Sequence, residues 1–145
     1  VRTSRGIPGS DLLWDLAPHS VALAVALFGP PGQVSAERDD RQARFRLECG
    51  ETRFDARLAW HAGPPERRLT VRGTAGELEL DELQPADPPP LTALCRDFIH
   101  CCRTRQQPLA DDRLGARVVA VIEALQESAR AGGTPVALEE ACACP

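Results

Sequence analysis

Two neighbouring segments of this sequence alternate apolar and polar residues with a period of two, and this pattern constrains the fold more than any other feature. The first is "ARFRLEC", whose apolar positions are Ala43, Phe45, Leu47 and Cys49. The second is "RFDARLAW", whose apolar positions are Phe54, Ala56, Leu58 and Trp60. Alternation of this kind is typical of antiparallel strands with one buried face and one polar face.

Further strands are expected on both sides of this pair. "VSAERDD" at 34–40 precedes it, and "RRLTVRG" and "ELELDE" follow, joined by the tight connection "GTAG" at 73–76. The proline-rich stretch "QPADPPP" at 84–90 cannot join a central strand, so we interpret it as a crossing loop. These patterns predict one open antiparallel sheet of four or more strands within residues 33–83.

Helices are expected before and after the sheet. The apolar stretch "VALAVALF" predicts a helix over about 17–28, which "GPPG" ends. Two later segments carry apolar residues at three-four spacing, one over 91–102 and one over 114–125. Asp111 or Asp112 would cap the last helix, and "TPVAL" at 134–138 would form a short final strand. We therefore predict one α+β domain over 1–145, an open antiparallel β-sheet with helices packed on one face.

Composition excludes several classes of function. With a net charge of −4 and a sequence pI near 5.4, the chain lacks the basic footprint of a nucleic-acid-binding protein. Its longest apolar run is far shorter than the roughly 20 residues that span a membrane. No signal peptide is recognisable, so we expect a cytoplasmic protein. All 17 basic residues are arginine, and methionine is absent even at position 1. We expect the chain to be the downstream part of a longer protein.

The six cysteines do not form a recognisable metal motif. No CxxC pair is present, and the adjacent Cys101 and Cys102 have poor spacing for zinc. Cys95 and Cys102 share the apolar face of the helix predicted over 91–102, where free cysteine would pack as a small hydrophobe. We expect reduced, structural thiols and no metal.

The stretch "DLLWDLAPHS" carries the residues best suited to chemistry. Pro18 favours a helix start, which would place His19 in the first turn, near the positive end of the helix dipole. That field would keep the imidazole neutral and able to accept a proton. Asp15, just before the helix, would then hold and orient one ring nitrogen. The simpler interpretation makes Asp15 a helix cap and His19 a histidine bonded to a backbone carbonyl.

The order of elements and several local strings resemble the C-terminal domain of the Gfo/Idh/MocA oxidoreductase family. The resemblance covers essentially the whole chain and includes "DLAPHS", "LECG" and "LTVRGTAGELELDE". Its most specific part is "PLTALCRDFIHCCRTRQQPLADDRLGARVVAVIEALQESARAGGTPVAL", in which helix, turn, helix and ending follow the family in order. Nucleotide-sugar and sugar-acid dehydrogenases of the family are the most similar.

The resemblance implies one half of a dehydrogenase that acts on a sugar, sugar acid or nucleotide sugar. NAD or NADP would bind an N-terminal Rossmann domain that is not present in this chain, so the isolated chain would be inactive. The family's acid-x-x-x-histidine motif falls on Asp15 and His19, which would be the catalytic residues. Ser20 departs from the pattern, because many relatives carry an acid there. The sheet would build a homo-oligomer, with no nucleic-acid or membrane partner.

Other residues are weaker candidates for the site. Arg2 and Arg5 lie upstream of the motif and could bind a substrate phosphate or carboxylate. Trp14 is a third candidate for contacting substrate, although Trp14 and Trp60 are more typical of core or interface packing.

Two alternative functions are compatible with the sequence. The chain could be a non-catalytic, stand-alone module that dimerises or binds a partner through the open face of its sheet. It could also be a thiol-based redox or metal protein that uses Cys101, Cys102 and the "CAC" tail at 142–144.

Overall fold

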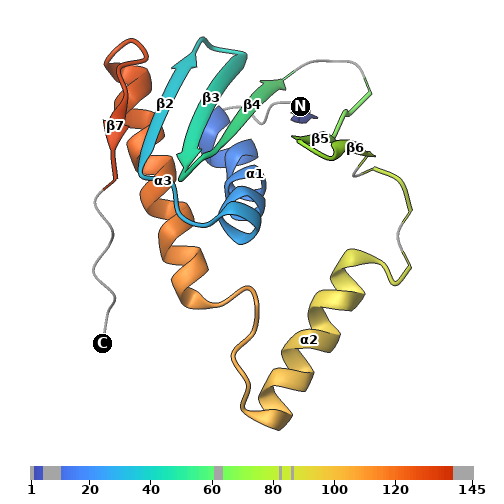
Figure 1. Cartoon of the computed structure of the whole chain (residues 1–145). Coiled ribbons are helices and arrows are strands. Elements are labelled where there is room, and N and C mark those ends of the chain that lie inside the picture. Colours follow the sequence, from blue (N-terminus) through green and yellow to red (C-terminus); the bar gives the residue numbers. More distant parts are fainter. Residues whose placement is uncertain (1, 5–10, 61–63, 82, 86, 139–145) are drawn as a thin grey trace.

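The computed structural model describes residues 2–4, 11–60, 64–81, 83–85 and 87–138. Seven strands and three helices follow one another in this part of the chain (Figure 1). In order they are β1 Arg2–Ser4, α1 Leu12–Phe28, β2 Gln33–Arg38, β3 Gln42–Cys49, β4 Thr52–Trp60, β5 Arg68–Gly73, β6 Gly76–Asp81, α2 Pro90–Thr104, α3 Asp112–Arg130 and β7 Val136–Ala137.

The main sheet has the strand order β1-β4-β3-β2-β7. Strands β4, β3, β2 and β7 pair antiparallel, whereas β1 pairs in parallel with β4. This confirms the α+β class with an open antiparallel sheet. The short strand β7 lies within the stretch where the sequence predicted it.

The predicted single sheet over 33–83 is wrong in one respect. Strands β5 and β6 form a separate two-stranded hairpin that is not bonded to the main sheet. Strand β1 occupies the outer edge of β4, which is the edge that β5 would need in order to continue the meander. The hairpin turn itself is as expected, because Gly73 pairs with Gly76 across a two-residue connection.

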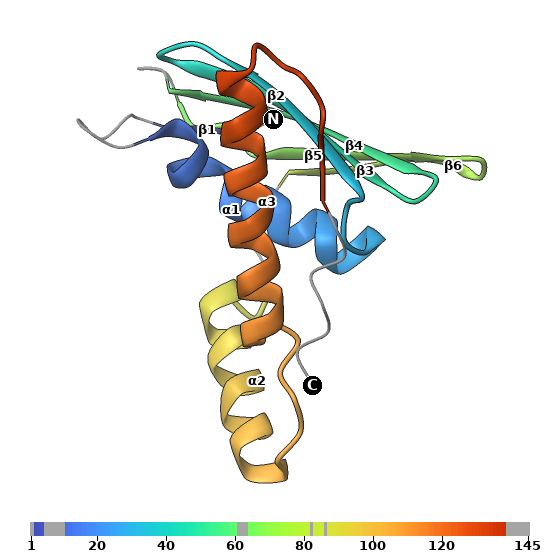
Figure 2. The same cartoon turned by 90° about the vertical axis from the view of Figure 1, so that its left-hand side faces the viewer.

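Helices α1 and α3 cover one face of the main sheet and pack against each other (Figure 2). The core lies between them and the sheet, and every alternating apolar residue of β3 is buried in it. Its largest fully buried side chains are Leu13, Leu47, Leu58, Ile122 and Leu125. The other face of the sheet carries the polar residues, as the period-two pattern predicted. No helix among the described residues is both long and apolar enough to cross a membrane.

Helix α2 lies away from the main sheet in both views (Figures 1 and 2). Of its residues only Cys101 is buried, and Phe98 is 62% exposed. The prediction that Cys95 and Cys102 are buried on an apolar face is therefore wrong, because both thiols are exposed. The apolar face exists, but no other described element covers it.

Helix α1 begins earlier than the sequence predicted. Its N-cap is Asp11, whose carboxylate accepts hydrogen bonds from the backbone N–H groups of Leu13 and Trp14. Pro18 therefore lies inside the helix rather than at its first position. The Asp11 cap stabilises this earlier start. Its carboxylate accepts from N–H groups of the first turn, which have no partner within the helix.

Candidate functional site

Asp15 lies in the first turn of α1 and is tied to the last residue of β4. The indole Nε1 of Trp60 donates a hydrogen bond to the Asp15 Oδ2 atom at 3.0 Å. Both residues are half-buried. Asp15 is thus inside the helix, not before it as predicted, and its carboxylate is fixed by the sheet. The N-cap role that the simpler interpretation gave to Asp15 belongs to Asp11.

His19 follows Asp15 by one helical turn and is exposed. Residues four apart on a helix lie on the same face, with about 5–6 Å between their Cβ atoms. The structure therefore places Asp15 and His19 side by side along α1. His19 is the eighth helical residue, since the helix begins at Leu12. The predicted placement of His19 in the first turn is therefore wrong, and His19 lies beyond the reach of the helix dipole, because that field falls off within the first turn.

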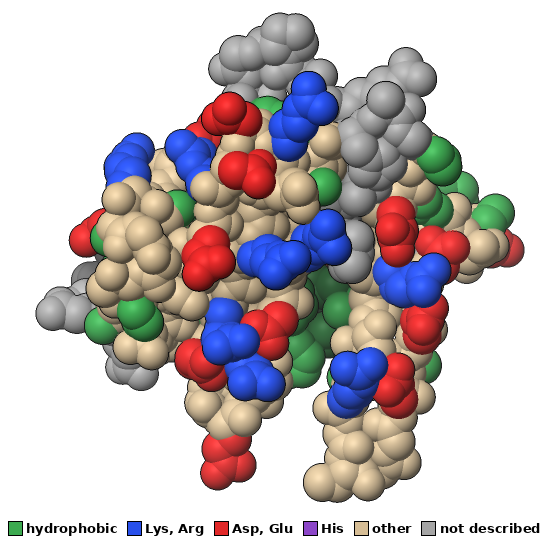
Figure 3. Space-filling view, turned by 90° about the horizontal axis from the view of Figure 1, so that it is seen from above, with side chains coloured by type: hydrophobic (Ala, Val, Ile, Leu, Met, Phe, Trp, Pro, Cys, Tyr) green, Lys and Arg blue, Asp and Glu red, His purple; other side chains and the backbone are tan. Residues whose placement is uncertain are grey.

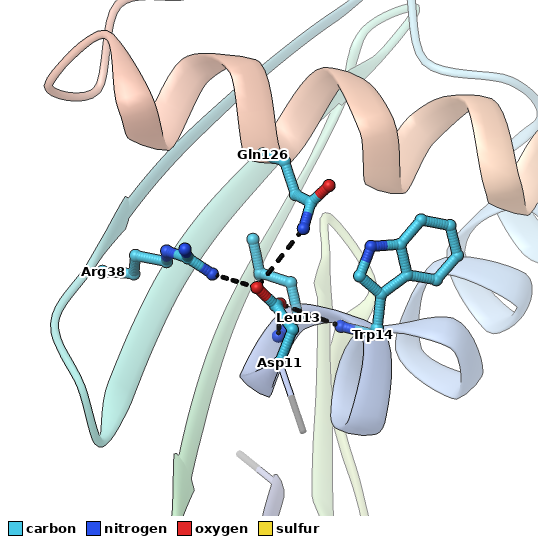
Figure 4. Close-up of polar contacts among 5 residues, drawn as sticks. All are labelled: Asp11, Leu13, Trp14, Arg38 and Gln126. Atoms are coloured by element: carbon cyan, nitrogen blue, oxygen red, sulfur yellow. Dashed lines mark hydrogen bonds and ion pairs between the residues drawn. The ribbon is translucent and has the colours of Figure 1, made fainter. Parts of the chain in front are cut away.

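Asp11 connects three elements at the start of α1 (Figure 4). Arg38, at the end of β2, donates from its guanidinium to Asp11 Oδ2 in an ion pair. Gln126 of α3 donates from Nε2 to the same oxygen at 3.3 Å. Together with the two capping bonds, these contacts hold the first turn of α1, and hence Asp15, against both β2 and α3.

The electrostatic balance at Asp11 favours its charged form. Burial raises the pKa of the Asp11 carboxyl, but the hydrogen bond and charge of Arg38 and the backbone N–H groups of Trp14 and Leu13 lower it. The lowering contributions outweigh the burial, so the pKa of Asp11 lies below its ordinary value of 3.8. The carboxylate is therefore ionised at neutral pH and remains available as a cap.

The three candidate substrate-binding residues, Arg2, Arg5 and Trp14, differ in what the structure shows of them. Strand β1 contains Arg2 and runs beside the end of β4, where Ser4 is paired with Trp60. Arg5 lies outside the described residues. Trp14 is 40% exposed, and its ring lies away from the Asp11–Arg38 pair in Figure 4. The backbone of β1 is thus brought to the Trp60 end of the site. Trp14 is accessible on α1, next to Asp15 in the sequence.

Sequence reasoning missed Asp11 and Trp60, and also Arg38 and Gln126, the two side chains that contact Asp11. Asp11 had a signal, because an aspartate directly before an apolar helix is a standard start signal. Trp60 had none as a partner of Asp15, since their contact joins residues 45 apart in the chain. Only the packing of β4 against α1 brings these two side chains together.

The described residues do not form a site for a metal or a dinucleotide. No group of three or more His, Cys, Asp or Glu side chains among them could hold a metal ion. A Rossmann unit pairs consecutive strands in parallel through a helix, with a glycine-rich turn at the phosphates. In the described part of the chain, consecutive strands that pair do so antiparallel.

Comparison with known proteins gives structural matches only. No protein-family model matches the sequence. No curated protein matches it significantly. Among solved structures, a candidate myo-inositol dehydrogenase from Sinorhizobium meliloti matches with a TM-score of 0.83 and 13% identity, covering 95% of this chain and 55% of that one. A candidate dehydrogenase from Thermotoga maritima matches with a TM-score of 0.80 and 14% identity, covering 96% of this chain and 55% of that one.

A third match was solved with ligands. It is an oxidoreductase from Agrobacterium radiobacter in complex with NAD+, L-tartaric acid and magnesium, with a TM-score of 0.68, 15% identity, and coverage of 94% of this chain and 55% of that one. The present chain thus spans little more than half the length of these oxidoreductases. The matches confirm the resemblance in fold to the C-terminal domain of Gfo/Idh/MocA oxidoreductases.

Proposed function

We propose that this chain is the substrate-binding and oligomerisation domain of an NAD(P)-dependent oxidoreductase that acts on a sugar, sugar acid or nucleotide sugar. The observation that carries the proposal is the structural likeness over nearly the whole chain to one part of several oxidoreductases. The ligands of the Agrobacterium enzyme, NAD+ and a small hydroxy acid, are compatible with this class of reaction.

Asp15 and His19 are the proposed catalytic pair. Trp60 holds one oxygen of Asp15, which limits the rotation of the carboxylate on a half-buried part of the helix. The next turn carries His19 on the same face and exposed, where a substrate can reach it. In the proposed reaction, His19 accepts the proton of a substrate hydroxyl, and Asp15 stabilises the imidazolium that forms. Both roles follow from the positions of the two side chains and do not depend on the helix dipole.

The nicotinamide cofactor would accept the hydride from the same substrate carbon, and its binding requires a domain outside this chain. What this chain contributes is a proton acceptor and a wall of the substrate pocket. Arg2, Arg5 and Trp14 are proposed to complete that wall, because all three lie near the start of α1 in the sequence. An arginine there would bind a substrate carboxylate or phosphate.

The first test is the intact mass of the native gene product, compared with the 15.7 kDa of these residues. A product of roughly twice this mass that reduces NAD+ or NADP+ with a sugar-type substrate is expected, since a second domain of ordinary size would account for it. A product of 15.7 kDa would contradict the proposal.

The catalytic pair is tested in the same product. Asp15→Asn and His19→Ala should each lower kcat/KM by about 100-fold or more, the usual contribution of a proton acceptor. His100→Ala is the matched control, because His100 is also an exposed helical histidine but lies on α2. Equal turnover of His19→Ala and His100→Ala would exclude His19 from the reaction.

A second candidate function is a non-catalytic assembly module. The exposed apolar face of α2 favours it, because large exposed apolar patches mark interaction surfaces. Under this alternative the native product has the mass of this chain and self-associates or binds a partner. Sedimentation of the isolated chain over a range of concentrations distinguishes it from a monomeric domain.

A further inference from the structure

Trp60 ends strand β4 and is held there by contacts from both neighbours of that strand. Its backbone N–H donates a hydrogen bond to the Arg41 carbonyl at 2.9 Å. On the other edge of β4, Trp60 is paired with Ser4 of β1. Its half-buried side chain packs against the hydrophobic core. The backbone that carries the indole is therefore fixed by the sheet.

The turn that contributes the Arg41 carbonyl is itself closed by hydrogen bonds. The Asp39 carboxylate oxygen Oδ1 accepts from the backbone N–H groups of Arg41 at 2.7 Å and of Gln42 at 2.8 Å. The backbone N–H of Asp39 donates to the Gln42 carbonyl at 2.9 Å. The two N–H donors hold the pKa of the Asp39 carboxyl below its ordinary value. The carboxylate is therefore ionised at neutral pH, and the turn presents a fixed carbonyl to Trp60.

From this fixed backbone the indole reaches the carboxylate of Asp15. Its Nε1 donates to Asp15 Oδ2 at 3.0 Å, and an indole N–H can donate a hydrogen bond but not accept one. No other side chain in the part of the chain that the structure describes bonds to the Asp15 carboxylate. Because an aspartate side chain has several staggered rotamers open to it, this bond selects one of them.

The bond leaves the second oxygen of Asp15 for the adjacent turn of α1. His19 lies on that turn, four residues on, with about 5–6 Å expected between the Cβ atoms of the two residues. The indole engages Oδ2, so Oδ1 is the oxygen with which Asp15 can accept an N–H of an imidazolium at His19. A carboxylate free to rotate would satisfy this arrangement only part of the time.

The contact between Trp60 and Asp15 lies on the face of the main sheet that the helices cover. Trp60 shares that face with Leu58, and Asp15 belongs to α1, which packs on it. The open face carries the charged residues of β3 and β4, and Figure 3 shows basic and acidic side chains interspersed over the molecule as seen from above. Assembly through the open face would therefore leave this contact undisturbed.

We propose that Trp60 is a positioning residue for the proposed reaction, because its indole fixes Asp15 with one oxygen directed to His19. The inference rests on the proposed function, in which Asp15 stabilises the imidazolium that forms when His19 accepts the substrate proton. Trp60 acts through Asp15 and touches no reacting atom. Without the indole, the proton acceptor is still present, but the carboxylate that stabilises its charged form is misplaced. Turnover then falls, whereas substrate binding changes little.

Steady-state kinetics of the native gene product with NAD+ or NADP+ tests this role, with glucose, gluconate and UDP-glucose as the sugar, the sugar acid and the nucleotide sugar. Trp60→Phe keeps most of the ring but loses the donor. It should lower kcat by about 10-fold or more, as the loss of hydrogen-bond partners that orient active-site ligands does, and leave KM nearly unchanged.

Phe54→Leu is the matched control. Phe54 is half-buried on the same face of β4 and packs against the core, but its side chain has no donor. The control should leave kcat nearly unchanged. A loss equal to that of Trp60→Phe would mean that the packing of β4 governs turnover, and it would overturn the proposal.

Asp15→Ala separates a role through Asp15 from a structural one. If Trp60 acts through Asp15, adding Trp60→Phe to Asp15→Ala should lower kcat no further. A further loss as large as the one in the wild-type background would contradict the positioning role, since a structural effect does not require Asp15.

A readout that needs neither substrate nor cofactor is the indole 15N–1H NMR signal of Trp60 in the same product, identified by its absence from Trp60→Phe. Loss of the acceptor in Asp15→Ala should move this signal and speed the exchange of the proton with solvent, whereas Phe54→Leu should leave both unchanged. An unchanged signal in Asp15→Ala would show that the bond is not formed in solution, and the proposal would be wrong.

Failure of this inference is distinguishable from failure of the proposed function. If His19→Ala loses turnover but Trp60→Phe retains it, the proposed function stands and the positioning role is wrong. If the wild type turns over none of the three substrates, the proposed function is contradicted and the positioning role falls with it.

Discussion

The indole of Trp60 and the carboxylate of Asp15 are joined by a 3.0 Å hydrogen bond between the end of β4 and the first turn of α1. The bond fixes Asp15, which the sequence pattern identified as a candidate catalytic residue. Its donor is Trp60, for which the sequence predicted only a packing role. It also links helix and sheet at the edge where β1 pairs with β4. The candidate site therefore depends on sheet packing as well as on the helix that carries it.

Replacing Trp60 by Phe tests this link. The variant keeps most of the ring's packing but removes the donor, so we expect the free energy of unfolding to fall by about 1.5–3 kcal/mol, the range for a hydrogen bond to a charged group. Urea denaturation of Trp60→Phe, Asp15→Ala and the double variant measures the coupling. A double variant that loses the full sum of the single effects would contradict a direct contact.

Asp11 should make the stability of the chain depend on acid. The pKa of its carboxyl is lower in the folded state than in the unfolded state, so its contribution is present above the unfolded value and is lost as pH falls through the folded pKa. Asp11→Asn keeps a capping side chain but not the charge. The difference in unfolding free energy between wild type and Asp11→Asn should shrink from about pH 5 downwards. A difference that is constant with pH would argue against the ion pair with Arg38.

Ser128 should be among the most sensitive polar positions. Its hydroxyl is fully buried, accepts a hydrogen bond from the Ala36 N–H at 2.9 Å and donates to the Thr134 carbonyl at 2.7 Å. Ser128→Ala leaves both backbone groups without their partner, which should cost about 1–3 kcal/mol for each group that stays dry. Chemical denaturation gives the value, and Ser20→Ala, on the half-buried surface of α1, serves as the control. Equal effects at the two positions would mean that the bridge adds no stability.

Truncation of Phe45 should lower the stability of the chain strongly, whereas truncation of Phe98 should leave it almost unchanged. Phe45 is 3% exposed in the core, and Phe98 is 62% exposed on α2. We expect Phe45→Ala to cost about 3–5 kcal/mol and Phe98→Ala to change stability by about 0.5 kcal/mol or less. If denaturation of the purified chain shows a comparable loss for both, then α2 is packed in solution against a surface that contributes to stability.

Local patterns predicted the local structure well. The alternation in β3 and β4 gave the buried face of each strand, and the three-four spacing located α2 and α3. Asp111 caps α3 as expected, because its carboxylate accepts from the Leu114 N–H at 2.7 Å. The main error within an element was the start of α1, where Pro18 was given more weight than the cap at Asp11.

Long-range relationships were beyond these patterns. The parallel pairing of β1 with β4, and the separation of the β5–β6 hairpin from the main sheet, depend on which distant segment occupies the free edge of β4. The apolar stripe of α2 indicated a buried face, yet a stripe does not identify the surface that covers it. The site shows the same limit, since Asp15 and His19 follow from their spacing but Trp60 does not.

Apart from β1 and the start of α1, the sequence by itself determined which segments form strands and helices and which side of each is apolar, because period and capping act over a few neighbouring residues. Tertiary structure alone decided that Trp60 holds Asp15 and that Arg38 and Gln126 meet at Asp11. The physical reason is that strand register and helix–sheet packing bring together residues far apart in the chain, and no local preference encodes those distances.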